Sequence, residues 1–92
     1  MQCGAWEYEN MVACDLPERA ATAFSKAIGG LVGVNYIPVL YVGHQIVSGT
    51  NYCIICKTTT VTNPPMPGCK AVYIYESLDG TCSIIKIEDV IS

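Results

Sequence analysis

The chain has 92 residues, which suits one domain spanning residues 1–92, and 51% of them are hydrophobic whereas 14% are charged. Its formal net charge is −3, and its five Lys and Arg residues are scattered, so no basic patch exists to bind a nucleic acid. No apolar run approaches the roughly 20 residues that cross a bilayer, so the sequence predicts no membrane partner.

The N-terminal residues form an arm over residues 1–14, because this stretch has no sustained hydrophobic periodicity. From Met1 to Glu7 the chain lacks the basic start and the apolar stretch of a secretory signal. We therefore expect a cytoplasmic protein whose six cysteines are reduced thiols.

One amphipathic helix is predicted over residues 16–31. Asp15, Pro17 and Glu18 form a capping-box pattern at its start. Apolar residues then recur at spacings of three and four, which places them on one face of a helix: Ala20, Ala23, Phe24, Ala27, Ile28 and Leu31. The glycines that follow this stripe weaken the helix and end it.

Four strands are predicted after the helix, over residues 35–47, 51–61, 71–76 and 82–87. Pro38 lies within the first of them, which favours an edge position or a bulge for that strand.

The connections between these strands are short, so we expect an antiparallel sheet. Ser48-Gly49 is predicted as a turn, residues 62–68 as a proline-rich loop, and Asp79-Gly80 as a two-residue hairpin turn. One apolar helix stripe and four strands predict an α+β fold in which the sheet wraps across the helix.

Residues 45–52 read Gln-Ile-Val-Ser-Gly-Thr-Asn-Tyr. This segment resembles the first hairpin of the cystatin superfamily, whose consensus is Gln-Val-Val-Ala-Gly followed by Thr-Asn-Tyr. The first five residues of the chain are also similar to the N-terminus of stefins, which are cystatins without a signal peptide or disulfides. Residues 71–78 resemble the family's third strand where it leads into the second hairpin.

The resemblance implies a cystatin-like fold and reversible, non-covalent inhibition of papain-like cysteine proteases. In that family a trunk with a flexible glycine, the first hairpin and the second hairpin form a wedge that fills the protease cleft. The matching residues here are Gly4 in the trunk, Gln45, Ile46, Val47, Ser48 and Gly49 in the first hairpin, and Leu78 in the second. The resemblance implies no catalysis, cofactor or metal, and it implies a monomer or a strand-exchanged dimer.

Two other functions stay open. One is a binding module of this fold without inhibitory activity. The other is a thiol redox or zinc protein that uses Cys53 and Cys56, which stand at CxxC spacing. In a strand, however, this separation places the two thiols on opposite faces, and Tyr52, Ile54 and Cys56 share one face. The single histidine, His44, is expected to be a solvated polar residue rather than a catalytic one.

Overall fold

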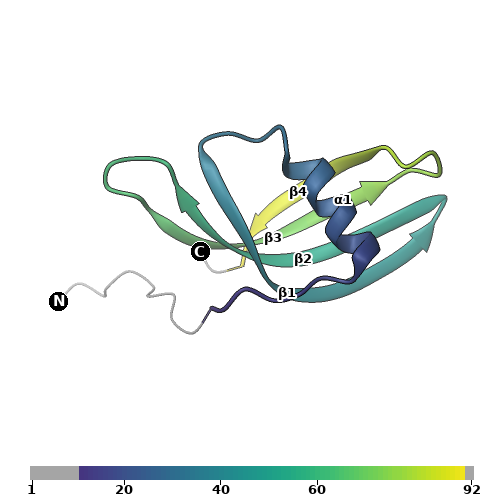
Figure 1. Cartoon of the computed structure of the whole chain (residues 1–92), viewed down its shortest axis with the longest axis horizontal. Helices are drawn as coiled ribbons and strands as arrows, with labels where there is room; N and C mark the ends of the chain where they lie inside the picture. Colours follow the sequence, from purple (N-terminus) through teal and green to yellow (C-terminus); the bar gives the residue numbers. More distant parts are fainter. Residues whose placement is uncertain (1–10, 91–92) are drawn as a thin grey trace.

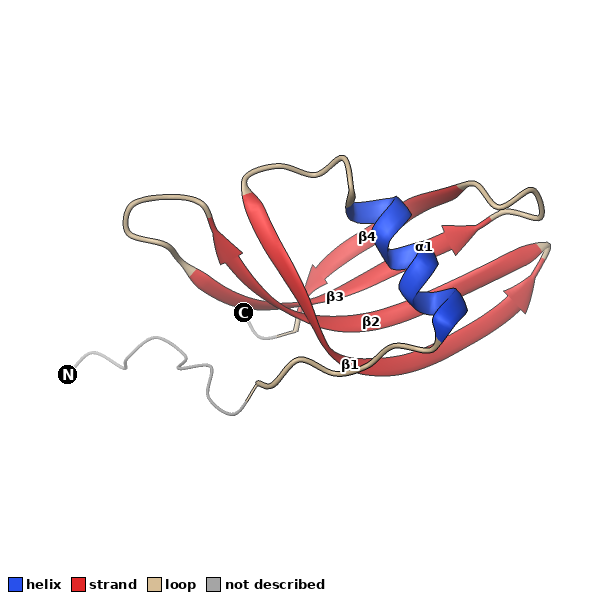
Figure 2. Cartoon of the chain, in the orientation of Figure 1, coloured by secondary structure: helices blue, strands red, loops and turns tan. Residues whose placement is uncertain are grey.

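One helix lies across a four-stranded antiparallel sheet in the computed structural model, which describes residues 11–90 (Figures 1 and 2). The strands stand in the sheet in the order in which they occur in the chain, and each pairs with the next. The elements are α1 (Glu18–Ile28), β1 (Val34–Val47), β2 (Gly49–Thr60), β3 (Pro67–Glu76) and β4 (Cys82–Asp89). The α+β class with an antiparallel sheet is therefore confirmed. Within residues 11–90, no helix has the length and apolar character needed to cross a membrane.

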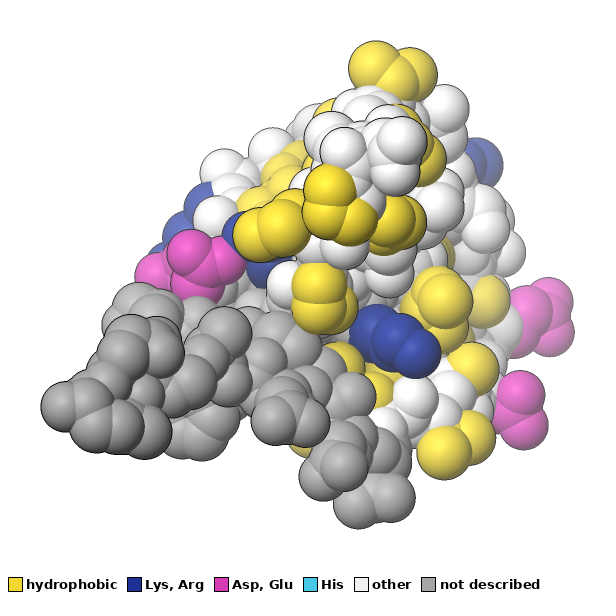
Figure 3. Space-filling view, turned by 90° about the vertical axis from the view of Figure 1, so that its left-hand side faces the viewer, with side chains coloured by type: hydrophobic (Ala, Val, Ile, Leu, Met, Phe, Trp, Pro, Cys, Tyr) yellow, Lys and Arg dark blue, Asp and Glu magenta, His cyan; other side chains and the backbone are white. Residues whose placement is uncertain are grey.

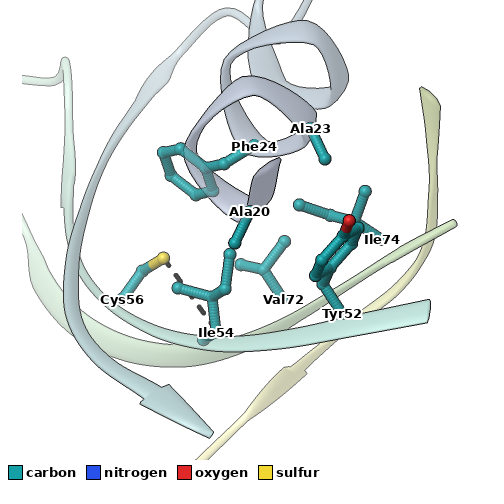
Figure 4. Packing of buried hydrophobic residues seen from close by; sticks show 8 residues of the cluster. All are labelled: Ala20, Ala23, Phe24, Tyr52, Ile54, Cys56, Val72 and Ile74. Carbon is teal, nitrogen blue, oxygen red and sulfur yellow. Dashed lines mark hydrogen bonds between the residues drawn. The ribbon is translucent and has the colours of Figure 1, made fainter. Parts of the chain in front are cut away.

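The core lies between α1 and the middle of the sheet (Figure 4). The helix contributes Ala20, Ala23 and Phe24, which belong to the predicted apolar stripe. The sheet contributes alternate residues of its two central strands: Tyr52, Ile54 and Cys56 from β2, and Val72 and Ile74 from β3. The predicted period of two in β2 is confirmed, because these three residues are all buried.

The helix is shorter than the predicted range of residues 16–31. It begins at Glu18 because Leu16 precedes a proline, which disfavours helical backbone at that residue. Pro17 has an extended ψ of 149° and no side chain caps the helix, so the capping box expected from Asp15 is not formed. The helix ends at Ile28, and Leu31 beyond it is 40% exposed rather than part of the core stripe.

β1 is an edge strand, and its register shifts at Pro38 and again after Tyr41. Both predictions for Pro38, an edge position and a bulge, are thus confirmed. β3 begins at Pro67, inside the predicted loop of residues 62–68, and extends to Glu76. A proline is compatible with the first position of a strand, because its missing N–H interrupts no ladder there.

The loops at one end of the molecule expose aliphatic side chains, and Figure 3 shows hydrophobic side chains on this end. Val32 is 92% exposed, and Val61 and Met66 are 63% and 60% exposed. The Val61 N–H donates to the Gly33 carbonyl at 2.9 Å, and this bond joins the loop after α1 to the loop after β2.

Candidate functional site

The turn between β1 and β2 (the first turn) and the loop between β3 and β4 (the second loop) lie together at the opposite end of the sheet (Figure 1). Val47 pairs with Gly49, which leaves Ser48 at the tip of the first turn. Thr50, which follows this turn, pairs with Glu76, the last residue of β3 before the second loop. The register of the sheet therefore brings the first turn and the second loop side by side.

The first turn depends on Gly49 in two ways. Its φ of +113° is a conformation that L side chains rarely adopt, as expected for a glycine in a tight turn. A Cβ atom at this position would also lie 2.5 Å from the Glu76 carbonyl oxygen and 2.7 Å from the Cε1 atom of Tyr75. The Tyr75 hydroxyl donates a hydrogen bond to the Ser48 carbonyl. Tyr75 thus packs against the turn and holds its tip.

The residues of the first turn expose apolar surface. Ile46 is 76% exposed and Val47 is 45% exposed, although both belong to a strand. At the base of the turn the Asn51 Nδ2 donates to the Gln45 Oε1 at 3.1 Å. This bond joins two polar side chains across the hairpin, just below the exposed aliphatic ones.

The second loop, residues 77–81, is longer than the predicted two-residue hairpin turn at Asp79-Gly80. The Gly80 N–H donates to the Ser77 carbonyl at 3.0 Å, and the Ser77 N–H donates to the Thr81 carbonyl at 2.8 Å. Asp79 therefore lies inside the loop rather than between two paired strand ends. Leu78 stands at the tip with 83% of its surface exposed.

Asp79 organises this loop through its carboxylate. The Ser77 hydroxyl donates to its Oδ1 atom, and the Thr81 N–H donates to the same atom at 3.0 Å. These hydrogen bonds, the Ser77 hydroxyl first, lower the pKa of Asp79 to about 2. The loop that presents Leu78 consequently carries an ionised, internally bonded aspartate.

Two cationic side chains of α1 connect the helix to this end of the sheet. The Arg19 Nη2 lies 3.2 Å from the Glu76 Oε1, which also accepts a hydrogen bond from the Tyr52 hydroxyl at 2.9 Å. Burial, followed by this bond to Glu76, raises the pKa of Tyr52. The Lys26 Nζ donates to the Gly80 carbonyl at 3.3 Å. The helix, the end of β3 and the second loop are thus linked by polar contacts.

A hollow of about 320 Å³ lies between the start of α1 and the first hairpin. Pro17 and Ala20 form its helix side, and Tyr41, Ile46 and Tyr52 form its sheet side. His44 also lines it and is exposed, in agreement with the expected solvated position. Its Nδ1 atom and the Tyr41 hydroxyl share a hydrogen bond of 3.3 Å.

Cys53 and Cys56 lie on opposite faces of β2, as their spacing predicted. Cys56 is fully buried beneath the helix, and this burial raises the pKa of its thiol to about 12. Cys53 is half-buried and, with Tyr73, borders a hollow on the other face of the sheet. Among residues 11–90, no three His, Cys, Asp or Glu side chains are grouped so as to hold a metal ion.

The predicted trunk glycine, Gly4, lies outside the described residues. The described part of the arm runs beside β1, where the Cys14 N–H donates to the Pro38 carbonyl at 3.0 Å. Followed backwards from Pro17 to Met11, it leads away from the two turns (Figure 1). The structure therefore brings Gln45–Gly49 and Leu78 to one end, and the described arm does not join them there.

Sequence reasoning did not identify Tyr75, Glu76 and Arg19 as residues of this site. Tyr75 lies in the predicted strand 71–76, and nothing local in the sequence indicates that it also holds the first turn. Its contact with Gly49 depends on the pairing of Thr50 with Glu76, which is a long-range feature.

No protein-family model, no curated protein and no solved structure matches this chain. The function must therefore be inferred from the residues and geometry of the molecule.

Proposed function

We propose that this chain is a reversible, non-covalent inhibitor of papain-like cysteine proteases with a cystatin-like fold. In this proposal the end of the sheet that bears both turns enters the cleft of the protease. The observation that carries the proposal is the gathering of Ile46, Val47 and Leu78, all exposed, on two neighbouring turns.

Exposed aliphatic side chains at adjacent turn tips contribute nothing to the stability of the isolated chain. A partner that buries them gains roughly 1.5–3 kcal/mol for each side chain fully removed from water. Apolar surface gathered in this way is typical of a protein interaction site.

The turns are also ordered before any partner binds. Tyr75 holds the Ser48 carbonyl, and Asp79 bonds within its own loop. A preordered turn loses less conformational entropy on binding than a flexible one, which favours affinity. β-Branched side chains such as Ile46 and Val47 add to this effect, because their χ1 angles are already restricted.

Titration of the purified chain against papain with a chromogenic substrate tests the proposal. We expect reversible competitive inhibition at micromolar concentration or below. Val47→Asp should weaken it at least about tenfold, since an aspartate cannot be buried without a partner. Val32→Asp is the matched control, because Val32 is 92% exposed at the other end of the molecule. Absence of inhibition at micromolar concentration, or equal losses in both variants, would contradict the proposal.

A binding module of the same fold without inhibitory activity is the second candidate. The course of residues 11–17 favours it, because this part of the arm leads away from the two turns instead of standing beside them (Figure 1). An ordered, folded chain that leaves papain fully active would support this candidate. The positions of Cys53 and Cys56 on opposite faces of β2 give no support to a redox or zinc site.

A further inference from the structure

The hollow between α1 and the first hairpin is continuous with the proposed binding surface. Ile46 is the shared element, since it is one wall of the hollow and also an exposed residue of the first turn. Because Ile46 is 76% exposed and also lines the hollow, a partner that packs on this residue lies beside the hollow.

A partner that covered this mouth without filling the hollow would enclose a space of about 320 Å³. The cores of protein interfaces pack at the density of protein interiors, and an enclosed gap forfeits the contacts of all the atoms that line it. The walls are largely apolar, so trapped water would find few partners there. Complementarity therefore requires a group from the partner inside the hollow.

The walls favour an aromatic ring as this group. On the sheet side the half-buried Tyr41 offers an aromatic side chain, whereas Tyr52 belongs to the buried core, and aromatic pairs gain about 0.5–1.5 kcal/mol beyond the area they bury. Arg19 also lines the hollow, and its side chain is 77% exposed. A guanidinium in this position can lie against the face of an incoming ring.

We infer that the hollow between α1 and the first hairpin receives one aromatic side chain of the protein that binds the two turns. The identity of that protein as a papain-like protease rests on the proposed function, whereas the affinity of the hollow for an aromatic ring does not.

The first experiment tests the hollow alone. N-acetylphenylalanine amide is added at millimolar concentration to the isotope-labelled chain, and N-acetylalanine amide serves as the control probe. We expect NMR shift changes at Ala20 and Ile46 with the aromatic probe only, and none at Val32. Equal responses to both probes, or no response at the hollow, would overturn the inference whatever the chain does to a protease.

The second experiment fills the hollow from within the chain. Thr50 lines the hollow and is half-buried, so Thr50→Phe should occupy the space and prevent the NMR response. It should also weaken inhibition of papain by more than about tenfold. Thr59→Phe is the control, because residue 59 lies on the other face of the same strand, near its far end. Circular dichroism and thermal unfolding establish that each variant is folded.

Because Thr50→Phe could perturb the neighbouring strands, His44→Trp fills the same hollow from an exposed position on β1. Inhibition that persists at full strength in both folded variants would refute the entry of a partner side chain. A wild-type chain that binds the aromatic probe but does not inhibit papain would refute the proposed function and leave the hollow as a ring-binding site.

Discussion

Gly49 combines two constraints at a single residue. Its positive φ requires a backbone that L side chains rarely adopt, and the space where a Cβ would stand is taken by Tyr75 and the Glu76 carbonyl. The first constraint comes from the tight turn itself, and the second comes from the close approach of the turn to the end of β3. The absence of a side chain at Gly49 therefore allows the turn to close and also allows it to pack against the end of β3.

We expect Gly49→Ala to lower the free energy of unfolding by at least about 1–3 kcal/mol, from backbone strain alone. The close contact with Tyr75 and Glu76 adds to that loss. Urea unfolding at equilibrium measures the change. Gly30→Ala is the control, since a Cβ there meets nothing within 4 Å, and its effect should stay within about 0.5 kcal/mol. Similar losses in the two variants would contradict both the strained backbone at residue 49 and its close contact with Tyr75.

The sequence predicted the positive φ of Gly49 but not its close contact with Tyr75. A glycine after Ser48, between two apolar runs, indicates a turn that needs a positive φ. The contact with Tyr75 depends instead on which residue of β3 pairs with Thr50. Register of that kind is set by the burial of a whole face of the sheet, so local composition does not reveal it.

Among the connecting elements, the second loop shows how side chains alter a turn. Asp-Gly between two strands is typical of a two-residue turn, yet residues 77–81 form a longer loop. The carboxylate of Asp79 accepts hydrogen bonds from Ser77 and Thr81 on either side of it. Aspartate side chains commonly bond to nearby backbone N–H groups in turns. Here those bonds place Asp79 within the loop and Leu78 at its tip.

The pH dependence of this loop follows from Asp79. Its pKa in the folded chain, about 2, lies below the usual 3.8, so its stabilising effect is present above about pH 4 and is lost as the pH falls through about 2. We expect the NMR shift of the Thr81 amide to titrate with a midpoint near 2. Asp79→Asn should retain the loop without this titration, because its side-chain oxygen still accepts, whereas Asp79→Ala should lose the loop. A midpoint close to the usual value would show that the carboxylate is not bonded as described.

Over the whole molecule, hydrophobic periodicity predicted the order of the elements and most of the core. The stripe of Ala20, Ala23 and Phe24 and the alternation of Tyr52, Ile54 and Cys56 each follow from one local pattern. The hollow beside Ile46 was not foreseen, because it arises where the start of α1 and the first hairpin fail to fill the space between them. Pro17 determines the residue at which α1 begins, whereas the position of α1 over the sheet is determined by the packing of the core.

The burial of Cys56 gives the whole fold a dependence on alkaline pH. Its thiol has a pKa of about 12 in the folded chain, above the usual 9.0, because ionisation under the helix would place a charge in the core. A raised pKa stabilises the folded state fully below about pH 9 and ceases to do so as the pH rises towards 12. We therefore expect the free energy of unfolding to fall steadily over this range.

Urea unfolding across the same range of pH tests this dependence. Cys56→Ala should make the decline shallower without removing it, because burial raises the pKa of Tyr52 as well. Cys56→Ala also leaves a small cavity, so the slope against pH, and not the absolute stability, is the quantity to compare. A decline that is equally steep in Cys56→Ala and in the wild-type chain would contradict the burial of this thiol beneath α1.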